Sequence, residues 1–403
     1  MIQRLYTKAI FVLLLVALVP GYPRMLVLGN VINVQAWTSV LLLVLLLGHF
    51  VVRRGKSIYV IYLAALFLCG AMLGYVVTGD FGLVLAHAYS FLPFINAFLL
   101  LELNIGFSFR PVLLGLTVCA AVGVITANFI HWFRPETLGL LLKEEEDVSG
   151  VIKLGRVSWA GYVIALPLIA QLGFLSIYTR KQRFIVLFCV PIILVGAVLT
   201  FSRTTLIALV SLLCFVLYSR RREMGLKGVT LVGLMCLGGS AFISWWSQIN
   251  PNLTNLINYR ILHFFSGSSE ISGDFSTRQI LYSEYLDRLT HSYFLGQGLG
   301  VPMSTYFGAT SWVDITLVSF AGPFGVFGVA LFVVFLRRVY ARINTHIDDQ
   351  GVRRLLVLVL FLALAISLND DIWSHKSFAV YFIYIINSYR GDVSAARAHM
   401  RPA

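Results

Sequence analysis

The sequence predicts an all-α polytopic membrane protein with about twelve transmembrane helices. Of its 403 residues, 59% are hydrophobic and only 12% are charged. Soluble domains carry about a quarter charged residues, so most of this chain must have lipid as its solvent. The composition therefore excludes a cytosolic enzyme, a secreted disulfide scaffold, a disordered tail and a soluble nucleic-acid binder.

The transmembrane helices are predicted from apolar stretches of sufficient length. A hydrocarbon core of ~30 Å requires about 20 helical residues. The first stretch lies behind a basic N-terminus, but residues 20–23 do not form a small-residue cleavage site, so we expect an uncleaved helix. The twelve stretches are 7–22, 31–52, 57–78, 81–104, 111–131, 157–178, 184–201, 204–219, 229–246, 312–336, 352–368 and 373–389.

The basic residues predict the orientation of these helices. With the N-terminus inside, 21 of the 31 lysines and arginines fall on the inner side, in clusters such as 53–56, 180–183 and 220–222. Short cytoplasmic loops of membrane proteins carry this excess of positive charge. Both termini are therefore predicted to be cytoplasmic, and the net charge of +13 reports orientation instead of nucleic-acid binding.

Two predicted external segments are too long to be simple connectors. The first is a loop at 131–156, within a region of nine helices at 1–246. The second is a large loop at 247–311, followed by helices 10 to 12 and a cytoplasmic tail at 312–403. The aromatic residues of the large loop indicate order, and we expect a helix over 276–290 at the membrane surface.

The cysteines indicate neither a disulfide nor a metal site. All five lie inside apolar runs and none forms a C-x-x-C motif, so they are expected to act as small hydrophobic residues. They are Cys69, Cys119, Cys189, Cys214 and Cys236.

Ser202 and Arg203 form the whole turn between the seventh and eighth predicted helices. An arginine at this depth either extends its side chain to the interface or faces a cavity or an anionic partner. Arg203 lies on the side that the positive-inside rule leaves poor in cations, and a guanidinium suits a phosphate or pyrophosphate group. Both interpretations of Arg203 stay open.

In the large loop, Ser276 or Thr277 is expected to cap the predicted helix and to place Arg278 in its first turn. A cation there is unfavourable unless an anion lies near. Arg278 therefore belongs either to a surface ion network with neighbouring carboxylates or to an anion site. The glycines that follow, Gly296, Gly298 and Gly300, predict a turn that allows close approach of backbones.

Asp314 lies at the outer edge of the tenth predicted helix, ahead of the glycines of Gly322-x-x-Gly325. A carboxylate at this position can cap the helix or interact with its dipole. It can equally serve as a base, or as the partner of Arg203 or Arg278 in a polar cavity. The residues alone do not favour either role.

Together these segments resemble the O-antigen ligase/polymerase family of bacterial polysaccharide assembly. The resemblance covers roughly residues 150–340, and order, sidedness and spacing all agree with it. The motifs that carry it are Ser202-Arg203, Arg278, Gly296-x-Gly298-x-Gly300, Val313-Asp314 and Gly322-x-x-Gly325, with Gly155-Arg156 before an earlier helix.

The resemblance implies a GT-C-like glycosyltransferase of the bacterial inner membrane. It would act at the periplasmic face on glycans carried by undecaprenyl pyrophosphate, with no cofactor, nucleotide sugar or metal. Arg203 and Arg278 would stabilise the pyrophosphate leaving group, and Asp314 would deprotonate or orient the acceptor hydroxyl. The further substrate contacts that it implies are Arg288, Arg156, Ser202, Gly298 and His291.

One departure favours a Wzy-type polymerase over a ligase within this family. Ligases carry a His-Asn pair where this chain has Val313-Asp314. The alternatives are a ligase that transfers glycan to lipid A-core and, in a different class, a flippase for the lipid-linked oligosaccharide. A polymerase would also be expected to work with a chain-length regulator protein.

Overall fold

A computed structural model of the 403-residue chain describes most of its helices. The described residues are 2–18, 24–27, 30–52, 57–133, 145–146, 152–153, 170, 175, 178–198, 209–215, 218, 237–238, 241, 244–245, 248, 271–302, 315–368, 371–373 and 378–399.

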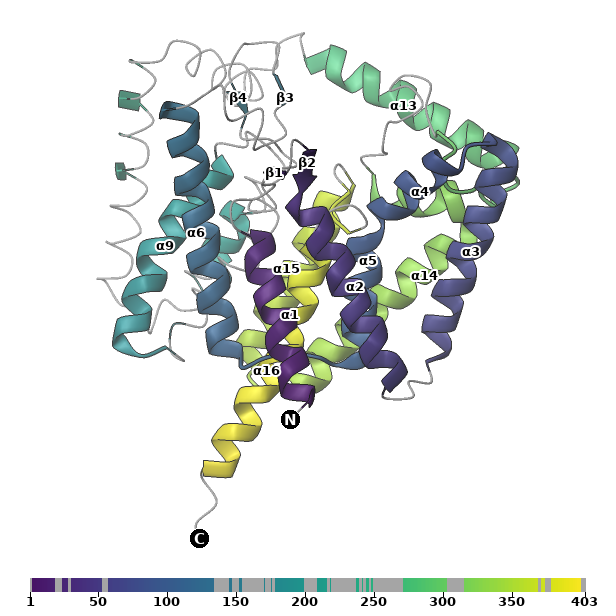
Figure 1. Ribbon diagram of the computed structural model, residues 1–403. Helices are drawn as coiled ribbons and strands as arrows, with labels where there is room; N and C mark the ends of the chain where they lie inside the picture. The colour runs from purple at the N-terminus through teal and green to yellow at the C-terminus, as the bar shows by residue number, and fades with distance from the viewer. Residues whose placement is uncertain are drawn as a thin grey trace.

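Helices dominate the described part of the chain, and four short strands form two hairpins (Figure 1). The strands are β1 (Arg24–Val27), β2 (Asn30–Asn33), β3 (Glu145–Glu146) and β4 (Ile152–Lys153). The helices are α1 (Ile2–Leu18), α2 (Val34–Val52), α3 (Ile58–Thr78), α4 (Phe81–Ser90), α5 (Leu92–Leu103), α6 (Phe109–Phe133), α9 (Arg180–Val198), α13 (Ile271–His291), α14 (Thr316–His346), α15 (Gln350–Ser367) and α16 (Phe378–His399).

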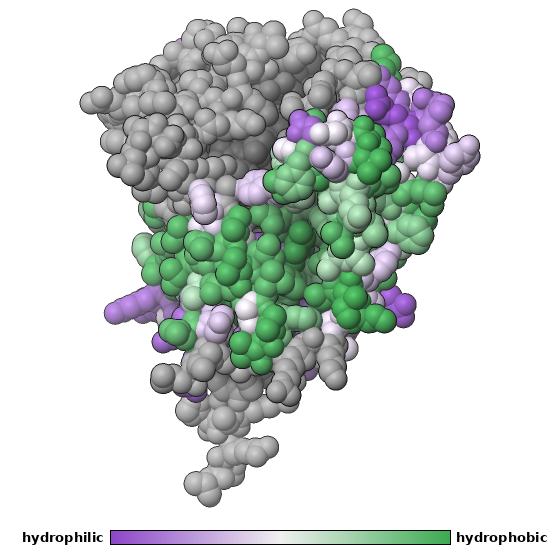
Figure 2. Space-filling view, turned by 45° about the vertical axis from the view of Figure 1, so that its right-hand side comes forward, coloured by the Kyte–Doolittle hydropathy of each residue, from purple (hydrophilic) through white to green (hydrophobic). Residues whose placement is uncertain are grey.

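Several helices have the length and composition of membrane spans. Among the described residues, α3, α14 and α15 are each long and apolar enough to cross a bilayer, and α4 with α5 makes a fourth span if the bent pair is counted as one. Three shorter apolar helices lie at 37–52, 109–125 and 378–389. Figure 2 shows apolar residues in a band across the middle of the molecule, with hydrophilic residues above and below it. The protein is therefore membrane-embedded.

The expected stretches 157–178, 204–219 and 229–246 lie wholly or mostly outside the described residues. The second stretch begins later than expected, because residues 30–33 form strand β2, paired with β1, and α2 starts only at Val34. Helix α1 begins and helix α16 ends at the lower end of the molecule in Figure 1. Helix α13 lies at the upper end. The molecule thus has two polar ends separated by an apolar band.

The expected single span 81–104 is two helices, α4 and α5, which meet at Phe91 with a bend of 48°. Pro93 in the first turn of α5 fits a new helix start, because it lacks the N–H that a continuous helix would need. The Phe91 side chain is fully buried, and its ring packs against the rings of Phe67, Phe320 and Phe324. Aromatic packing therefore fills the bend.

Helix α5 lies in the core of the bundle, packed against α2 and α16. Nearly all of its residues are buried, as its mostly apolar sequence predicts. Asn104 ends the helix in a left-handed conformation, with φ 52°. Asn387 of α16 donates from Nδ2 to the carbonyls of Leu100 and Ile105, at 2.8 and 3.2 Å, so a carbonyl of the last turn of α5 has a buried partner.

Helix α14 has 31 residues and continues ten residues beyond the expected span 312–336. A helix of this length measures about 46 Å, which exceeds the hydrocarbon core of ~30 Å. Its backbone is broken at Gly325, which has φ 62° and ψ −148°, shortly after Pro323. This break determines how the loop before α14 packs.

Candidate functional site

The break in α14 receives the glycine turn that follows α13. In an unbroken helix the carbonyl of Gly322 would accept from the N–H of Val326. Here the Gly322 carbonyl accepts from the N–H of Gln297 at 2.8 Å, and the Val326 N–H donates to the carbonyl of Phe294 at 2.8 Å. The turn is thus inserted into one hydrogen bond of the helix, and both freed backbone groups keep a partner.

Three glycines of the turn face three different helices. Gly296, Gly298 and Gly300 all have positive φ, at 94°, 92° and 85°. A Cβ on Gly296 would lie 2.6 Å from the backbone nitrogen of Gly325 in α14, and one on Gly298 would lie 2.8 Å from the backbone carbon of Leu73 in α3. One on Gly300 would lie 3.0 Å from a backbone nitrogen of α4. The predicted close approach of backbones is confirmed, and its partners are other segments of this chain.

Hydrogen bonds fix the same turn to α3 and α4. The N–H of Leu299 donates to the carbonyl of Gly70 in α3 at 2.8 Å, and the N–H of Gly300 donates to Nδ1 of His87 in α4 at 2.8 Å. Since Nδ1 accepts this bond, His87 carries no proton on that nitrogen. The sequence analysis did not identify His87, because its partner is a backbone group more than 200 positions away.

Helix α13 confirms the helix expected over 276–290, but it begins at Ile271. Ser276 and Thr277 therefore lie inside the helix, and the prediction that one of them caps it was wrong. Residues 271–275 include one glycine and no proline, so a helix can extend through them. The helix start inferred at Ser276 or Thr277 was therefore too late in the chain. Arg278 lies in the second turn, not the first.

The apolar side of α13 packs on the start of α14. Leu281 and Tyr285 are buried against Leu289, Ile315 and Val318. The hydroxyl of Tyr282 donates to the carbonyl of Leu368, at the end of α15, at 3.2 Å. The helix is therefore held across one polar end of the bundle, at the top of Figure 1.

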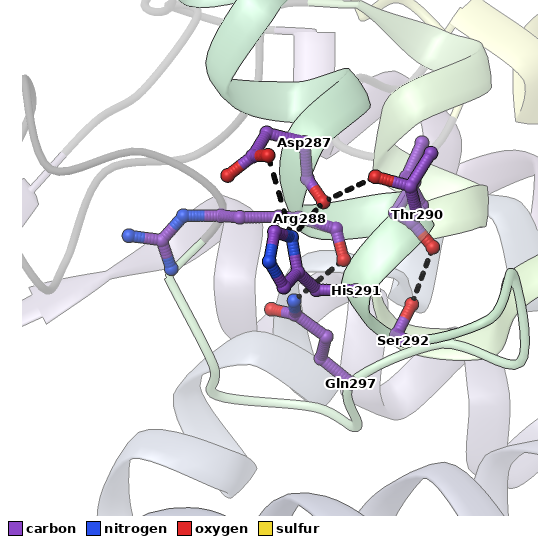
Figure 3. A network of polar contacts seen from close by, with 7 residues as sticks. Asp287, Arg288, Thr290, His291, Ser292 and Gln297 are labelled. Carbon is purple, nitrogen blue, oxygen red and sulfur yellow. Dashed lines mark hydrogen bonds and ion pairs between the residues drawn. The ribbon is translucent and has the colours of Figure 1, made fainter.

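Of the candidate residues on α13, Arg288 is the one tied to the glycine turn (Figure 3). Its half-buried guanidinium donates from Nη1 to the carbonyl of Pro302 at 2.6 Å. Its own carbonyl accepts from Nε2 of Gln297 at 3.0 Å. These two bonds join the end of α13 to both ends of the turn, and they direct the Arg288 side chain away from His291 in Figure 3.

His291 interacts with its own helix. Its Nδ1 lies 2.8 Å from the carbonyl oxygen and 3.3 Å from the carboxylate of Asp287, one turn earlier. The side chains of His291 and Asp287 are 74% and 69% exposed, so this pair contributes little to stability. Gly298, another candidate, is buried against Gly74.

A buried carboxylate near the first residue of α14 is a candidate that the sequence analysis did not single out. Asp371 is 2% exposed and accepts from the hydroxyl of Thr316 at 3.0 Å and from the N–H of Trp373 at 3.3 Å. The indole of Trp373 donates in turn to Ser367 Oγ at 2.7 Å. Its sequence signal is the polar group at 369–371, which lies between the apolar stretches 352–368 and 373–389.

The start of α14 also bears on Asp314. Helix α14 begins at Thr316 and Ile315 occupies its N-cap position, where an isoleucine side chain has no acceptor. Asp314 therefore does not occupy the N-cap position. The remaining candidates Arg156, Ser202, Arg203 and Asp314 lie outside the described residues, and of Arg278 the structure describes the backbone.

Metal ligands do not gather anywhere in the described part of the chain, where no three His, Cys, Asp or Glu side chains form a group. The described cysteines Cys69, Cys119, Cys189 and Cys214 are free thiols.

No known protein family matches the chain, and a comparison with curated proteins finds no relative.

Proposed function

We propose that this protein is a polymerase of lipid-linked oligosaccharide repeat units, such as those of O-antigen. It would transfer the growing glycan from undecaprenyl pyrophosphate to a sugar of the incoming undecaprenyl-pyrophosphate repeat unit. The residue pattern from Ser202 to Gly325 is the basis of this proposal. Its proposed partner is a protein that regulates the length of the glycan chain.

One observation of the structure supports it most. Two motifs of the resemblance, the glycine turn and the Gly-x-x-Gly segment of α14, interlock through the hydrogen bonds of Gln297 and Val326. This joint fixes α13, which carries Arg278 and Arg288, across a polar end of an apolar helix bundle. A helix that carries two arginines at such a place can present guanidinium groups to a lipid-linked pyrophosphate, whose charged group lies at the membrane surface.

In the proposed reaction, a hydroxyl oxygen of the acceptor sugar attacks the anomeric carbon of the donor glycan. The new glycosidic bond forms as the bond between that carbon and the pyrophosphate oxygen breaks. The hydroxyl proton passes to a base, and undecaprenyl pyrophosphate leaves with the electron pair. Catalysis then needs cations at the departing pyrophosphate and a group that accepts or orients the proton.

We assign the cationic role to Arg203 and Arg278 and the proton-accepting or orienting role to Asp314. Arg278 and Arg288 are ten residues apart, about 15 Å along the axis of α13. This separation favours contacts of the two arginines with different parts of the substrate. Ser202, Arg156 and His291 stay proposed substrate contacts, whereas Gly298 is buried against Gly74 of α3 and serves the packing of the turn.

The proposal includes the full topology predicted from the sequence. Twelve GT-C-like spans would cross the bacterial inner membrane, with both termini cytoplasmic and α13 at the periplasmic face. The position of α13 at the end opposite the start of α1 and the end of α16 supports this arrangement.

A flippase is the second candidate, because the bend between α4 and α5 and the break in α14 are features that transporters use at their substrate sites. In transporters such breaks line a cavity. Here the first is filled by the ring of Phe91 and the second by the glycine turn, which favours the polymerase.

The glycan phenotype of a deletion separates the candidates. A polymerase deletion leaves lipopolysaccharide capped with a single repeat unit, whereas a ligase deletion leaves uncapped core. A flippase deletion leaves no surface repeat at all. Single-repeat lipopolysaccharide, restored to long chains by the plasmid-borne gene, is the expected result, and either other pattern would overturn the proposal.

A further inference from the structure

At the end of the bundle opposite α13, the last turns of α14 and the end of α5 line an open-sided cavity of about 480 Å³. Its lining holds two arginines and a histidine and, among the described residues that line it, no carboxylate. The lining residues are Leu101, Asn104, Arg338, Ala341, Arg342, Thr345 and His346.

Arg338 is held at this cavity by a buried acid. Its Nη2 lies 2.9 Å from Oε1 of Glu102, whose side chain is 8% exposed. The other carboxylate oxygen of Glu102 accepts from the hydroxyl of Ser57 at 2.8 Å. The guanidinium of Arg338 also lies over the ring of Tyr59, with 4.5 Å between its central carbon and the ring centroid. Glu102 therefore fixes Arg338 and offsets one of the two arginine charges.

Arg342 is oriented by a separate chain of bonds. Its Nη2 donates to the carbonyl of Leu101 at 2.7 Å, and its Nη1 lies 3.2 Å from Nε2 of His346. Since a guanidinium cannot accept, Nε2 of His346 is the acceptor and its proton lies on Nδ1. That Nδ1 is 2.8 Å from Oγ1 of Thr345, whose hydroxyl donates to the carbonyl of Ala341 at 2.9 Å. The Leu101 carbonyl and the His346 ring thus help to orient the second guanidinium.

We infer that this cavity binds a phosphate group with a single negative charge, and that its source is the phosphodiester headgroup of an anionic phospholipid. Oriented guanidinium groups match phosphate oxygens, and basic pockets between membrane helices take such headgroups.

The position of the cavity favours a lipid over a free anion. Arg338 lies 22 residues after the start of α14, about 33 Å along a helix, which is close to one hydrocarbon thickness. Tyr59 is at the beginning of the apolar helix α3, where aromatic side chains mark the membrane interface. The neighbouring Ile58 and Ile61 are 74% and 66% exposed, and they offer apolar surface to acyl chains.

The test measures lipid binding by native mass spectrometry of the full-length protein in detergent. The probes are phosphatidylglycerol, phosphatidylcholine and inorganic phosphate. Arg342→Gln should weaken phosphatidylglycerol binding about tenfold, because it removes charge-assisted hydrogen bonds. Arg337→Gln is the matched control, since Arg337 is exposed on the same turn of α14 and does not line the cavity. It should bind phosphatidylglycerol as the parent does.

A second variant covers the case in which Arg342→Gln fails to fold. Ala341→Glu places a carboxylate at an exposed lining position that a helix tolerates, and it should also abolish selectivity for phosphatidylglycerol. Gln350→Glu adds the same charge on exposed surface of α15 and should not. Binding of inorganic phosphate without phosphatidylglycerol, lost in Arg342→Gln, would assign the same cavity to a free anion and overturn the lipid source. The site would be overturned if the parent protein bound phosphatidylglycerol and phosphatidylcholine equally. It would also be overturned if Arg337→Gln and Gln350→Glu lost as much phosphatidylglycerol binding as Arg342→Gln and Ala341→Glu.

Discussion

Gly296 and Gly325 face each other across the break in α14 with no space for a side chain on the first. A Cβ on Gly296 would lie 2.6 Å from the backbone nitrogen of Gly325, and both residues have positive φ. The joint between the large loop and the membrane helices is therefore made of backbone. Its geometry depends on glycine at these positions.

The first prediction concerns this joint. Gly296→Ala should reduce the yield and thermal stability of folded protein strongly, because it adds overpacking of about 1–3 kcal/mol to the cost of a positive φ. Gly79→Ala is the matched control, since Gly79 has φ 66° and a Cβ there would meet nothing within 4 Å. That change should cost only the conformational strain of about 1–2 kcal/mol. Fluorescence-detected size-exclusion chromatography after heating measures the stability of both variants. Equal melting temperatures for Gly296→Ala and Gly79→Ala would contradict the close backbone packing at Gly296.

The second prediction concerns the proposed pyrophosphate site. Arg278→Ala and Arg203→Ala should each abolish polymer while leaving protein levels normal, because the one remaining arginine of the pair would stabilise the departing pyrophosphate too weakly. Lysine should restore little activity, since an ammonium lacks the planar fork of a guanidinium. Arg354→Ala, an exposed arginine of α15, is the control. Gel analysis of surface glycan is the measurement, and long chains from a correctly inserted Arg203→Ala protein would return Arg203 to an interfacial role.

The third prediction concerns Asp314. Asn replaces Asp well wherever the role is a hydrogen-bonded turn or cap, so a structural Asp314 would make Asp314→Asn nearly silent. If Asp314 is a base, Asp314→Asn should slow polymerisation about 10²- to 10⁴-fold. A pH–rate profile distinguishes the base from an arginine-positioning group, since only a titrating base makes the acid limb depend on Asp314. Chain lengths like those of the parent would leave catalysis to the arginines.

The fourth prediction concerns Asp371. In Asp371→Asn the side-chain carbonyl can still accept from Thr316 and from the N–H of Trp373, so stability should fall by only about 1 kcal/mol. If the charge orients a cationic group of the site, polymer should nevertheless be lost. Thr316→Val keeps the carboxylate and removes one bond, and it should retain polymer. The same glycan profile for both variants would mean that Asp371 is structural.

The fifth prediction concerns topology. A reporter fused near Lys227 should report the cytoplasm, and one near Asn252 should report the periplasm, because the basic clusters alternate with apolar stretches in that register. Paired alkaline phosphatase and fluorescent-protein fusions measure this. Exchange of the two signals would require a different number of helices before the large loop.

The sequence by itself determined the membrane character of this protein and the approximate position of most described helices. The length of an apolar stretch is a local property, and a stretch of about 20 apolar residues is stable as a helix in lipid wherever it occurs in the chain. Helix α3 at 58–78 therefore matches the stretch expected at 57–78. The helix predicted over 276–290 likewise appears as α13. The glycines that follow it, at 296, 298 and 300, predicted a turn that other backbones approach closely. These features depend on neighbours in the chain.

Only the tertiary structure decided what those features contact. The apolar sequence of 81–104 does not reveal a 48° bend at Phe91, because the bend is stabilised by aromatic rings from α3 and α14. Nor does the chain's local sequence reveal that the Gln297 N–H bonds to the carbonyl of Gly322 and the Val326 N–H to the carbonyl of Phe294. It also does not reveal that Asp371 accepts from Thr316, the first residue of α14. Each of these is a pairing between groups distant in sequence, and such pairings arise from packing, since the local pattern is compatible with many partners.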